Sequence, residues 1–497
     1  MLFNSFKFML FFPLAVLGFY VIPRKIRCIW LFICSYIFYM AWNPEYALLI
    51  LTSTVLTYAG SLIISRAAAT GKSKRFKKTV LVCVIICNLS ILAWFKYTNF
   101  FLSIVNTCAA WAGIPLYLRG IDVILPVGIS FYTFQAVGYS IDVYRGEVSP
   151  EKNFLKYALF VSFFPQLVAG PIERSTNLLP QIRATAETKF RIDRVYHGLL
   201  LMLWGFFLKM VIADRITVLV DTVFRHYYLY GGIELIVGAV FFAVQIYCDF
   251  SSYSTIAIGA AEVLGIRIME NFEAPYLAGS VREFWKRWHI SLSTWFRDYL
   301  YIPLGGNRVS CGRRNFNLLV TFLVSGLWHG ASMNFVVWGG LHGLYQVTAD
   351  VTRQFRDRAV TLFQIRTDCF SFKAFRVIVT FILTDLAWIF FRADNLTVAL
   401  SYIARIFTDF NPWMLSNGSL YELGIDRVDM HILVFALLLL VAADFIRYYK
   451  QQSMIDFVLE QNVVFHFVFI GFILMYIVIF GAYGPAFNAK AFIYFQF

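Results

Sequence analysis

Apolar runs long enough to cross a lipid bilayer recur from the first residues of this chain to the last. A transmembrane helix needs about 20 consecutive, mainly apolar residues, and inside lipid only helices and closed barrels satisfy their own backbone polar groups. The composition agrees, because 60% of the 497 residues are hydrophobic and only 14% are charged, whereas soluble domains carry roughly 25% charged residues. We therefore predict an all-α, polytopic membrane protein.

The hydropathy pattern predicts about ten transmembrane helices. No polar block of domain size separates the apolar runs, so we expect a single membrane domain over residues 1–497. Within it we distinguish N-terminal helices over 1–97, a core over 98–483 and an aromatic C-terminal tail over 484–497. The expected spans lie near residues 8–22, 27–42, 45–65, 79–97, 123–144, 195–216, 233–254, 374–393, 431–448 and 463–483.

The basic residues lie in short loops between these spans, as in the loops at residues 24–27 and 72–78. Loops rich in Lys and Arg stay on the cytoplasmic side of a membrane, so we expect the N-terminus, the acidic segment 394–429 and the tail outside. This distribution accounts for the net charge of +14 without a nucleic-acid partner. The eight cysteines form no close CxxC pair, so we expect neither a metal site nor a disulfide framework.

Two apolar stretches, near residues 154–172 and 317–347, break the alternation of sides because basic residues follow both of their ends. We interpret both as re-entrant. The first is interrupted by Pro165 and by Gly170-Pro171, and such broken backbone is tolerated at membrane depth only where protein or a water-filled cavity satisfies it. The second carries Trp328-His329-Gly330 near its expected turn.

Ionisable groups within the membrane cost on the order of 3 kcal/mol each, so each one needs a reason. His329 lies among small residues that let other backbone or a ligand come close, which favours a reactive centre, although a buried histidine bonded to a backbone carbonyl fits equally well. For His342 we favour the second of these explanations, a buried histidine with a structural role. His289 belongs to the segment 284–300, where Trp285 and Trp295 share one face at helical spacing. We predict an interfacial amphipathic helix there.

These imidazoles suit acyl transfer to a hydroxyl. An alcohol is a poor nucleophile at neutral pH, and an imidazole within hydrogen-bond reach can take its proton as it attacks a thioester, for an acceleration of about 10² to 10⁴. A second histidine can orient the first or stabilise the oxyanion. On the segment around His289, Lys286, Arg287 and Arg297 offer positive charge to an anionic donor. No GxSxG, HExxH or Walker motif appears in the sequence.

Several motifs resemble those of the membrane-bound O-acyltransferase (MBOAT) family, and the likeness extends over nearly the whole chain. The stretches that carry it are Trp328-His329-Gly330, the segment 285–299, the segment 163–172, Pro126-Val127-Gly128, Tyr247-Cys248-Asp249-Phe250-Ser251, Asn271-Phe272 and Pro303-Leu304-Gly305-Gly306-Asn307. Within the family the chain is similar to the bacterial AlgI-like branch of alginate and peptidoglycan O-acetyltransferase subunits. It is more distantly similar to the DltB-type proteins that transfer D-alanine.

The resemblance implies an MBOAT fold, with re-entrant and interfacial helices around a central funnel, and makes residues 98–483 the catalytic core. It places the family's essential histidine at His329 and its second motif histidine at His289. We assign donor binding to Lys286, Arg287, Trp288 and Trp328. It further implies acetyl-CoA or an acyl carrier as donor with no permanently bound cofactor, a polysaccharide acceptor, an SGNH-type acetyltransferase partner outside, and a place in the bacterial cytoplasmic (inner) membrane.

The last residues of the sequence, Phe492-Ile493-Tyr494-Phe495-Gln496-Phe497, are strongly aromatic. An aromatic anchor at the membrane interface is one explanation. The resemblance implies another, in which Tyr494 carries the acyl group from the membrane channel to the outer partner as a covalent relay.

Two other functions stay open on the sequence alone. The same channel could serve D-alanyl transfer to a cell-envelope polymer, and a polysaccharide transporter without any covalent step would need the same kind of membrane domain. Against the transporter stand the two Trp-His motifs and the lack of the internal repeats that many transporters show.

Overall fold

The computed structural model describes residues 1–122, 125–168, 170–483 and 493. The described residues form helices joined by loops, with no strand and one isolated β-bridge between Phe272 and Trp288. The all-α prediction is therefore confirmed. The chain forms two compact units, the first over residues 1–202 and 256–269 and the second over 203–255 and 270–497.

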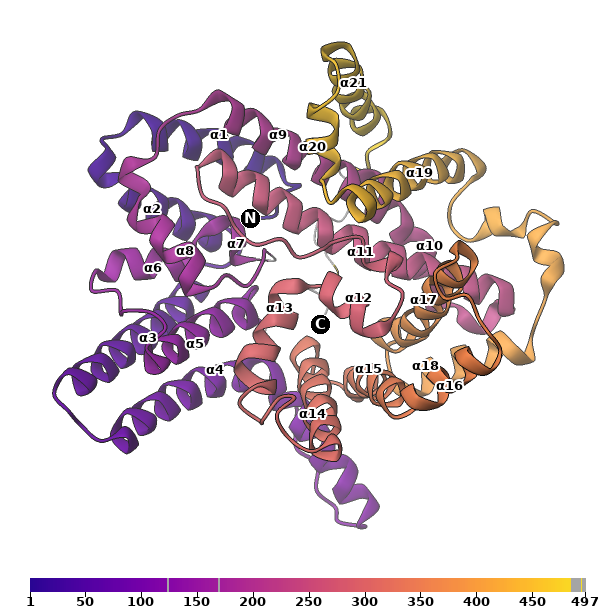
Figure 1. The fold of residues 1–497 in the computed structure, drawn as a ribbon, viewed down its shortest axis with the longest axis horizontal. Coiled ribbons are helices and arrows are strands. Elements are labelled where there is room, and N and C mark those ends of the chain that lie inside the picture. Colours follow the sequence, from indigo (N-terminus) through magenta and orange to yellow (C-terminus); the bar gives the residue numbers. More distant parts are fainter. Residues whose placement is uncertain (123–124, 169, 484–492, 494–497) are drawn as a thin grey trace. The chain divides into compact units, whose positions relative to one another are not determined.

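The first unit contains the N-terminal helices, and α3, α4 and α5 lie side by side within it (Figure 1). Its helices are α1 (Phe6–Val21), α2 (Arg27–Met40), α3 (Tyr46–Ala69), α4 (Lys74–Trp111), α5 (Ile129–Arg145), α6 (Phe154–Ser162), α7 (Phe164–Leu167) and α8 (Ser175–Arg183). Helix α9 (Ile192–Phe207) begins in this unit and ends in the second, and α11 (Gly232–Val263) begins in the second unit and ends in the first.

The second unit contains the remaining helices. They are α10 (Asp214–Arg225), α12 (Val281–Arg287), α13 (Ile290–Phe296), α14 (Cys311–His329), α15 (Met333–Val351), α16 (Arg353–Leu362), α17 (Phe370–Arg392), α18 (Leu396–Thr408), α19 (Arg427–Lys450), α20 (Met454–Leu459) and α21 (Val463–Phe480). Among the described residues, two wider, π-helical turns occur, at Leu208–Ala213 between α9 and α10 and at Arg297–Tyr301 after α13.

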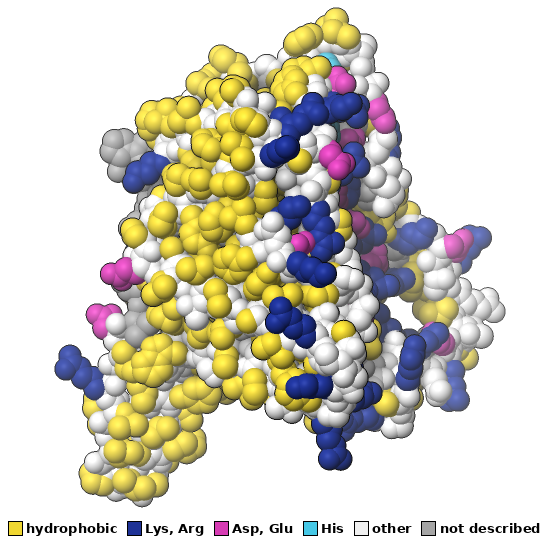
Figure 2. Space-filling model, turned by 90° about the vertical axis from the view of Figure 1, so that its left-hand side faces the viewer, with side chains coloured by type: hydrophobic (Ala, Val, Ile, Leu, Met, Phe, Trp, Pro, Cys, Tyr) yellow, Lys and Arg dark blue, Asp and Glu magenta, His cyan; other side chains and the backbone are white. Residues whose placement is uncertain are grey.

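Seven helices of the described chain are long and apolar enough to cross a membrane. They are Tyr46–Ala69, Lys74–Trp111, Ile192–Arg225, Gly232–Val263, Phe370–Arg392, Arg427–Lys450 and Val463–Phe480. The other spans expected from hydropathy coincide with the shorter helices α1, α2 and α5. Large apolar side chains lie exposed on the candidate spans, such as Leu48 and Phe101, and Figure 2 shows a face covered largely by hydrophobic side chains. The protein is a multi-pass membrane protein.

The broken backbone predicted near residues 154–172 is present, and the first unit buries it. Helix α6 ends at Ser162 and α7 starts at Phe164. The amides of Gln135 and Gln166 both donate to the carbonyl oxygen of Phe160, at 2.7 and 3.0 Å, and the Phe164 N–H donates to the Ser35 hydroxyl at 3.1 Å. Side chains from neighbouring helices thus satisfy the backbone groups that the break releases, as a buried irregular segment requires.

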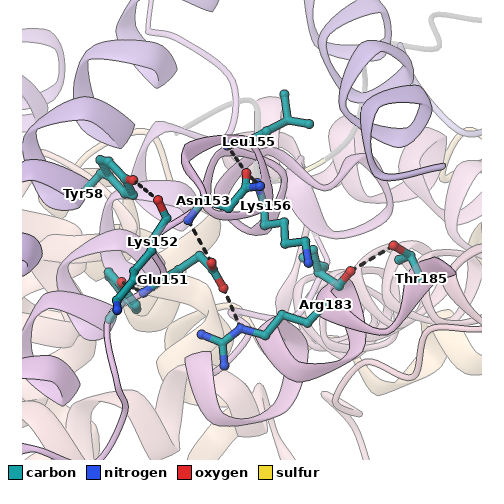
Figure 3. A network of polar contacts seen from close by, with 10 residues as sticks. Tyr58, Glu151, Lys152, Asn153, Leu155, Lys156, Arg183 and Thr185 are labelled. Carbon is teal, nitrogen blue, oxygen red and sulfur yellow. Dashed lines mark hydrogen bonds and ion pairs between the residues drawn. The ribbon is translucent and has the colours of Figure 1, made fainter. Parts of the chain in front are cut away.

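A polar network fixes the start of this broken segment (Figure 3). The Glu151 carboxylate accepts hydrogen bonds from the Arg183 guanidinium at 2.5 Å and from the Asn153 backbone N–H at 2.9 Å. The Asn153 side chain caps α6 by accepting from the Leu155 and Lys156 N–H groups, as N-cap residues do. These contacts join the first turn of α6 to α8.

Candidate active site

Three histidines of the second unit meet in one aromatic cluster. His289 lies between α12 and α13, His329 is the last residue of α14, and His342 lies in the middle of α15. All three side chains are buried, with relative exposures of 0%, 5% and 0%. The structure therefore brings together the two histidines that the sequence singled out, although 40 positions separate them in the chain.

The ring centres of His289 and His329 are 6.4 Å apart. Trp328 lies close to both, at 6.0 Å from the His289 ring and 4.9 Å from the His329 ring. The Phe250 ring from α11 lies 4.6 Å from the His289 ring. General acid–base catalysis requires an imidazole close to the reacting hydroxyl, and the two imidazoles lie in one cluster.

His342 connects to the same cluster through tryptophans. Its ring lies 5.0 Å from that of Trp338, which in turn lies 4.9 Å from the His329 ring. The Trp285 indole N–H donates to Nδ1 of His342 at 3.2 Å. This hydrogen bond makes Nδ1 the acceptor and assigns the imidazole proton of the neutral ring to Nε2. The contacts agree with the structural role that we favoured for His342.

His329 is presented by a tight helical hairpin. Helix α14 ends at His329 because Gly330 is extended, and α15 starts at Met333 after three intervening residues. The two helices touch at glycines, since a Cβ added to Gly326 would lie 2.1 Å from the Phe335 carbonyl oxygen. Small residues at a helix interface allow this close approach. The turn expected near Trp328-His329-Gly330 is thus confirmed.

His289 sits at a break that the sequence did not reveal. The residues 284–300 were expected to form one amphipathic helix, and this expectation is wrong. Helix α12 ends at Arg287, Trp288 is extended, and His289 adopts the left-handed conformation with φ 45° and ψ 54° before α13 begins. Few non-glycine residues adopt this conformation, and they do so where neighbouring contacts impose it.

A short segment before α12 imposes the break. The Ile290 N–H donates to the Asn271 carbonyl oxygen at 3.0 Å, and the Glu273 N–H donates to the Arg287 carbonyl oxygen at 3.0 Å. The buried Asn271 side chain accepts from the N–H and the hydroxyl of Ser291, at 3.2 and 2.7 Å. These bonds replace the helical hydrogen bonds lost around His289, and we call residues 271–273 the latch segment.

The same packing explains why the aromatic face does not lie at a membrane interface. Trp285, Trp288 and Trp295 are 8%, 1% and 9% exposed. Trp288 packs against Phe272 of the latch segment and Trp388 of α17, with ring centres 5.0 and 5.1 Å away. The tryptophans that helical periodicity assigned to an interfacial face therefore fill the protein core.

The four residues assigned to donor binding lie in different surroundings. Trp328 belongs to the histidine cluster, Trp288 is buried beside it in the core, and Lys286 is exposed. Arg287 pairs with the Glu283 carboxylate at 3.1 Å, donates to the Glu273 carbonyl oxygen at 3.1 Å, and stacks over the Tyr448 ring. Donor contact by these residues stays a prediction, as does the role of Tyr494, which lies outside the described residues.

One cluster of charged residues in the second unit was not identified as a cluster by the sequence analysis. Lys209 forms buried ion pairs with Asp214 and Asp249, at 2.6 to 2.7 Å, within the second unit. Lys209 and Asp249 both fall inside apolar runs of the sequence, and ionisable residues at such positions are costly and commonly functional. This cost was the signal that could have singled them out.

Replacing Asn271 with alanine is expected to lower turnover about tenfold or more. The change removes the acceptor for both Ser291 donors, and a buried donor left without a partner costs about 1–3 kcal/mol, which loosens the backbone that positions His289. Ser291→Ala removes only one of the two bonds and should cost less. Acyl-transfer assays on the two single variants and the double variant would check this. Effects that simply add would contradict a shared latch.

Sequence comparison with known proteins identifies the family of this chain. The sequence profile described as MBOAT, membrane-bound O-acyltransferase family, matches residues 36–388. The chain is 38% identical over 413 residues to the "Probable alginate O-acetylase AlgI" of Pseudomonas syringae pv. tomato, covering 83% of this chain and 76% of that protein. It is 34% identical over 437 residues to the peptidoglycan O-acetyltransferase of Helicobacter pylori, covering 81% of this chain and 79% of that protein.

A more distant likeness extends over less of the chain. The teichoic acid D-alanyltransferase of Bacillus subtilis is 26% identical over 230 residues, covering 44% of this chain and 57% of that protein. The family match and the alignments with the two acetyltransferases extend over most of the sequence, and the family match includes both clustered histidines. The chain therefore belongs to the membrane-bound O-acyltransferase family and is an O-acyltransferase.

Proposed function

We propose that this protein moves an acetyl group from a cytoplasmic thioester, acetyl-CoA, across the bacterial cytoplasmic membrane to hydroxyls of an extracytoplasmic polysaccharide, either alginate-like or peptidoglycan. The alginate O-acetylases and the peptidoglycan O-acetyltransferase among its relatives support the acetyl group and the class of acceptor. The carrying observation is the His289–His329 pair, two buried imidazoles with ring centres 6.4 Å apart.

In this proposal His329 is the general base. Its imidazole takes the proton of the acceptor hydroxyl as the hydroxyl oxygen attacks the carbonyl carbon of the thioester. The new C–O bond forms, the C–S bond breaks, and the proton on His329 goes to the departing thiolate. His289 stabilises the negative oxygen of the tetrahedral intermediate by hydrogen bonding. The aromatic rings around both histidines exclude water that would otherwise hydrolyse the thioester.

The donor is held by residues near this pair. Trp328, beside both imidazoles, contacts the acyl end, and Trp288 supports it from the core. Lys286 and Arg287 attract the phosphates of coenzyme A, or the phosphopantetheine of an acyl carrier, by charge. The exposed Lys286 is available for this directly. Arg287, which is paired with Glu283, would share its guanidinium with the donor.

Tyr494 is the proposed first acceptor. Its phenol oxygen would take the acetyl group as an ester, and an SGNH-type partner outside the membrane would then transfer it to the polymer. Tyr494→Phe is expected to reduce polymer acetylation to background while leaving membrane insertion intact. Mass spectrometry of the C-terminal peptide after incubation with acetyl donor should show an acetyl adduct on the wild-type peptide only. Full acetylation by the Tyr494→Phe variant would remove Tyr494 from the pathway.

The ester content of envelope polysaccharides tests the proposed function as a whole. Polysaccharides purified from cells with and without this protein should differ in ester-linked acetate, and supplying labelled acetyl donor should label the polymer. D-alanyl transfer, for which the likeness to the teichoic acid D-alanyltransferase speaks, would instead change ester-linked D-alanine. Equal ester content of both kinds in the two strains would refute an acyl-transfer function.

A further inference from the structure

The buried ion cluster of Lys209, Asp214 and Asp249 accepts a further hydrogen bond from outside the cluster. The Lys209 ammonium lies 2.7 Å from Asp214 Oδ1 and 2.6 Å from Asp249 Oδ1, and the three side chains are 1% to 2% exposed. The second oxygen of Asp249, Oδ2, accepts a hydrogen bond from the backbone N–H of Ile493 at 2.7 Å. Ile493 itself is 2% exposed. A charged acceptor buried in the protein thus binds the backbone of Ile493.

The charged groups of the cluster favour a further hydrogen-bond donor such as a backbone N–H. Two carboxylates face one ammonium, and their remaining buried oxygens need hydrogen-bond donors. A backbone N–H donating to a carboxylate is a strong, charge-assisted contact. The Ile493 amide meets this need at Asp249.

A second contact holds the start of the same segment. The π-helical turn Leu208–Ala213, which carries Lys209, also presents the carbonyl oxygen of Met210, and this oxygen accepts from the Ala482 N–H at 2.8 Å. Wide turns of this kind occur frequently at functional sites. Ala482 therefore bonds to this turn, and Ile493 bonds to the ion partner of the turn, Asp249.

Asp249 is the sequence neighbour of a residue that contacts the histidine cluster. Asp249 precedes Phe250 in α11, and the Phe250 ring packs 4.6 Å from the His289 ring. Ile493 precedes Tyr494 in the sequence, and neighbouring Cα atoms are about 3.8 Å apart. An anchor at Ile493 therefore holds the residue that immediately precedes Tyr494 in the sequence.

We propose that Lys209, Asp214 and Asp249 form an internal docking site for the C-terminal segment, with Asp249 as a positioning residue that holds the Ile493 amide and so presents Tyr494 to the histidine pair. The presentation of Tyr494 rests on the proposed function, whereas the docking itself does not. The cluster orients the segment and contacts no reacting atom.

The rate of trypsin cleavage after Lys490 measures the docking without any activity assay. Lys490 is the one Lys or Arg between Ala482 and Phe497 in the sequence. Ile493→Pro removes the backbone N–H and leaves the ion cluster unaltered, while Ile493→Ala keeps the N–H and serves as the matched control. For the full-length protein in lipid nanodiscs, we expect Ile493→Pro to lose residues 491–497 about tenfold faster than Ile493→Ala, as the loss of a hydrogen bond to a charged group implies. Intact mass spectrometry follows the release.

Asp249→Ala should accelerate release as much as Ile493→Pro, and the double variant should add nothing, because both remove the same bond. Equal release rates for Ile493→Pro and Ile493→Ala would overturn the docking site. Polymer acetylation should fall about tenfold further in Ile493→Pro than in Ile493→Ala, and equal acetylation would overturn the presentation of Tyr494.

If release differs while the wild-type protein acetylates no polymer, docking stands and the proposed function fails. If release is equal while the wild-type protein acetylates polymer normally, the proposed function stands and docking fails.

Discussion

Replacing His329 with alanine is expected to lower acetyl transfer at least about a hundredfold. The substitution removes the base that takes the hydroxyl proton, and general-base catalysis contributes about 10² to 10⁴ in rate. His329 is well placed for this loss to be large, because its ring is buried between Trp328 and Trp338, where no water can easily replace it. Ester-linked acetate on the polymer, measured per molecule of membrane-inserted protein, gives the readout.

A matched histidine variant separates chemistry from folding. His226 caps α10 outside the aromatic cluster, with Nδ1 3.2 Å from the Thr222 carbonyl oxygen, and His226→Ala should keep acetyl transfer within about twofold of wild type because surface changes of this kind have small effects. His329→Gln retains a polar side chain of similar length and should be as inactive as His329→Ala. Normal transfer by either His329 variant, with unchanged thermal unfolding, would contradict the assignment of the base.

His289 calls for a different replacement because its backbone is left-handed, with φ 45°. Alanine in this conformation costs about 1–2 kcal/mol, whereas asparagine adopts it readily. His289→Asn therefore removes the imidazole with little strain. We expect transfer to fall about ten- to a hundredfold, less than for His329, because His289 stabilises charge and takes no proton. Turnover of purified protein with acetyl-CoA measures the effect.

The double variant His289→Asn, His329→Ala should be no slower than His329→Ala alone. Residues that act on one transition state lose their effects together, so such losses do not add. Independent, multiplicative losses would mean that the two imidazoles serve separate steps. Restored transfer in the double variant would contradict cooperation altogether.

The helices were predictable from the sequence because a chain that crosses lipid must satisfy its own backbone hydrogen bonds. Each expected span coincides with a described helix, as 463–483 does with α21 and 431–448 with α19, since about 20 apolar residues in a row have few alternatives. Polar N-caps bound many of them. Asn462, for example, accepts from the Phe465 N–H and Asp426 from the Asp429 N–H, which fixes the first helical turn.

The break at His289 was not predictable in the same way. The spacing of Trp285 and Trp295 fits a continuous helix, and the pattern carries no proline or glycine to interrupt it. The interruption comes from Asn271 and Glu273, whose backbone and side-chain groups bond across the gap. Tertiary contacts thus override local propensity here, and local rules fail at the residue assigned to catalysis, as expected for functional sites.

The proximity of His289 and His329 also depended on tertiary structure. The sequence indicated each histidine by its cost inside a membrane, and the resemblance joined them, but the aromatic rings around them come from α14, α15 and α17. The link between the C-terminal segment and Asp249 lies still further from sequence reasoning, because a backbone amide leaves no residue-type signal.

The central claim is that the His289–His329 pair activates a hydroxyl beside a thioester, and single-turnover transfer in proteoliposomes tests it most directly. Acetyl-CoA labelled in its acetyl group would be supplied on one side of the membrane, and labelled ester on the protein or on an acceptor at the other side would be followed over time. We predict label transfer by the wild-type protein and none above background by His329→Ala. Equal label transfer by the two proteins would contradict the account.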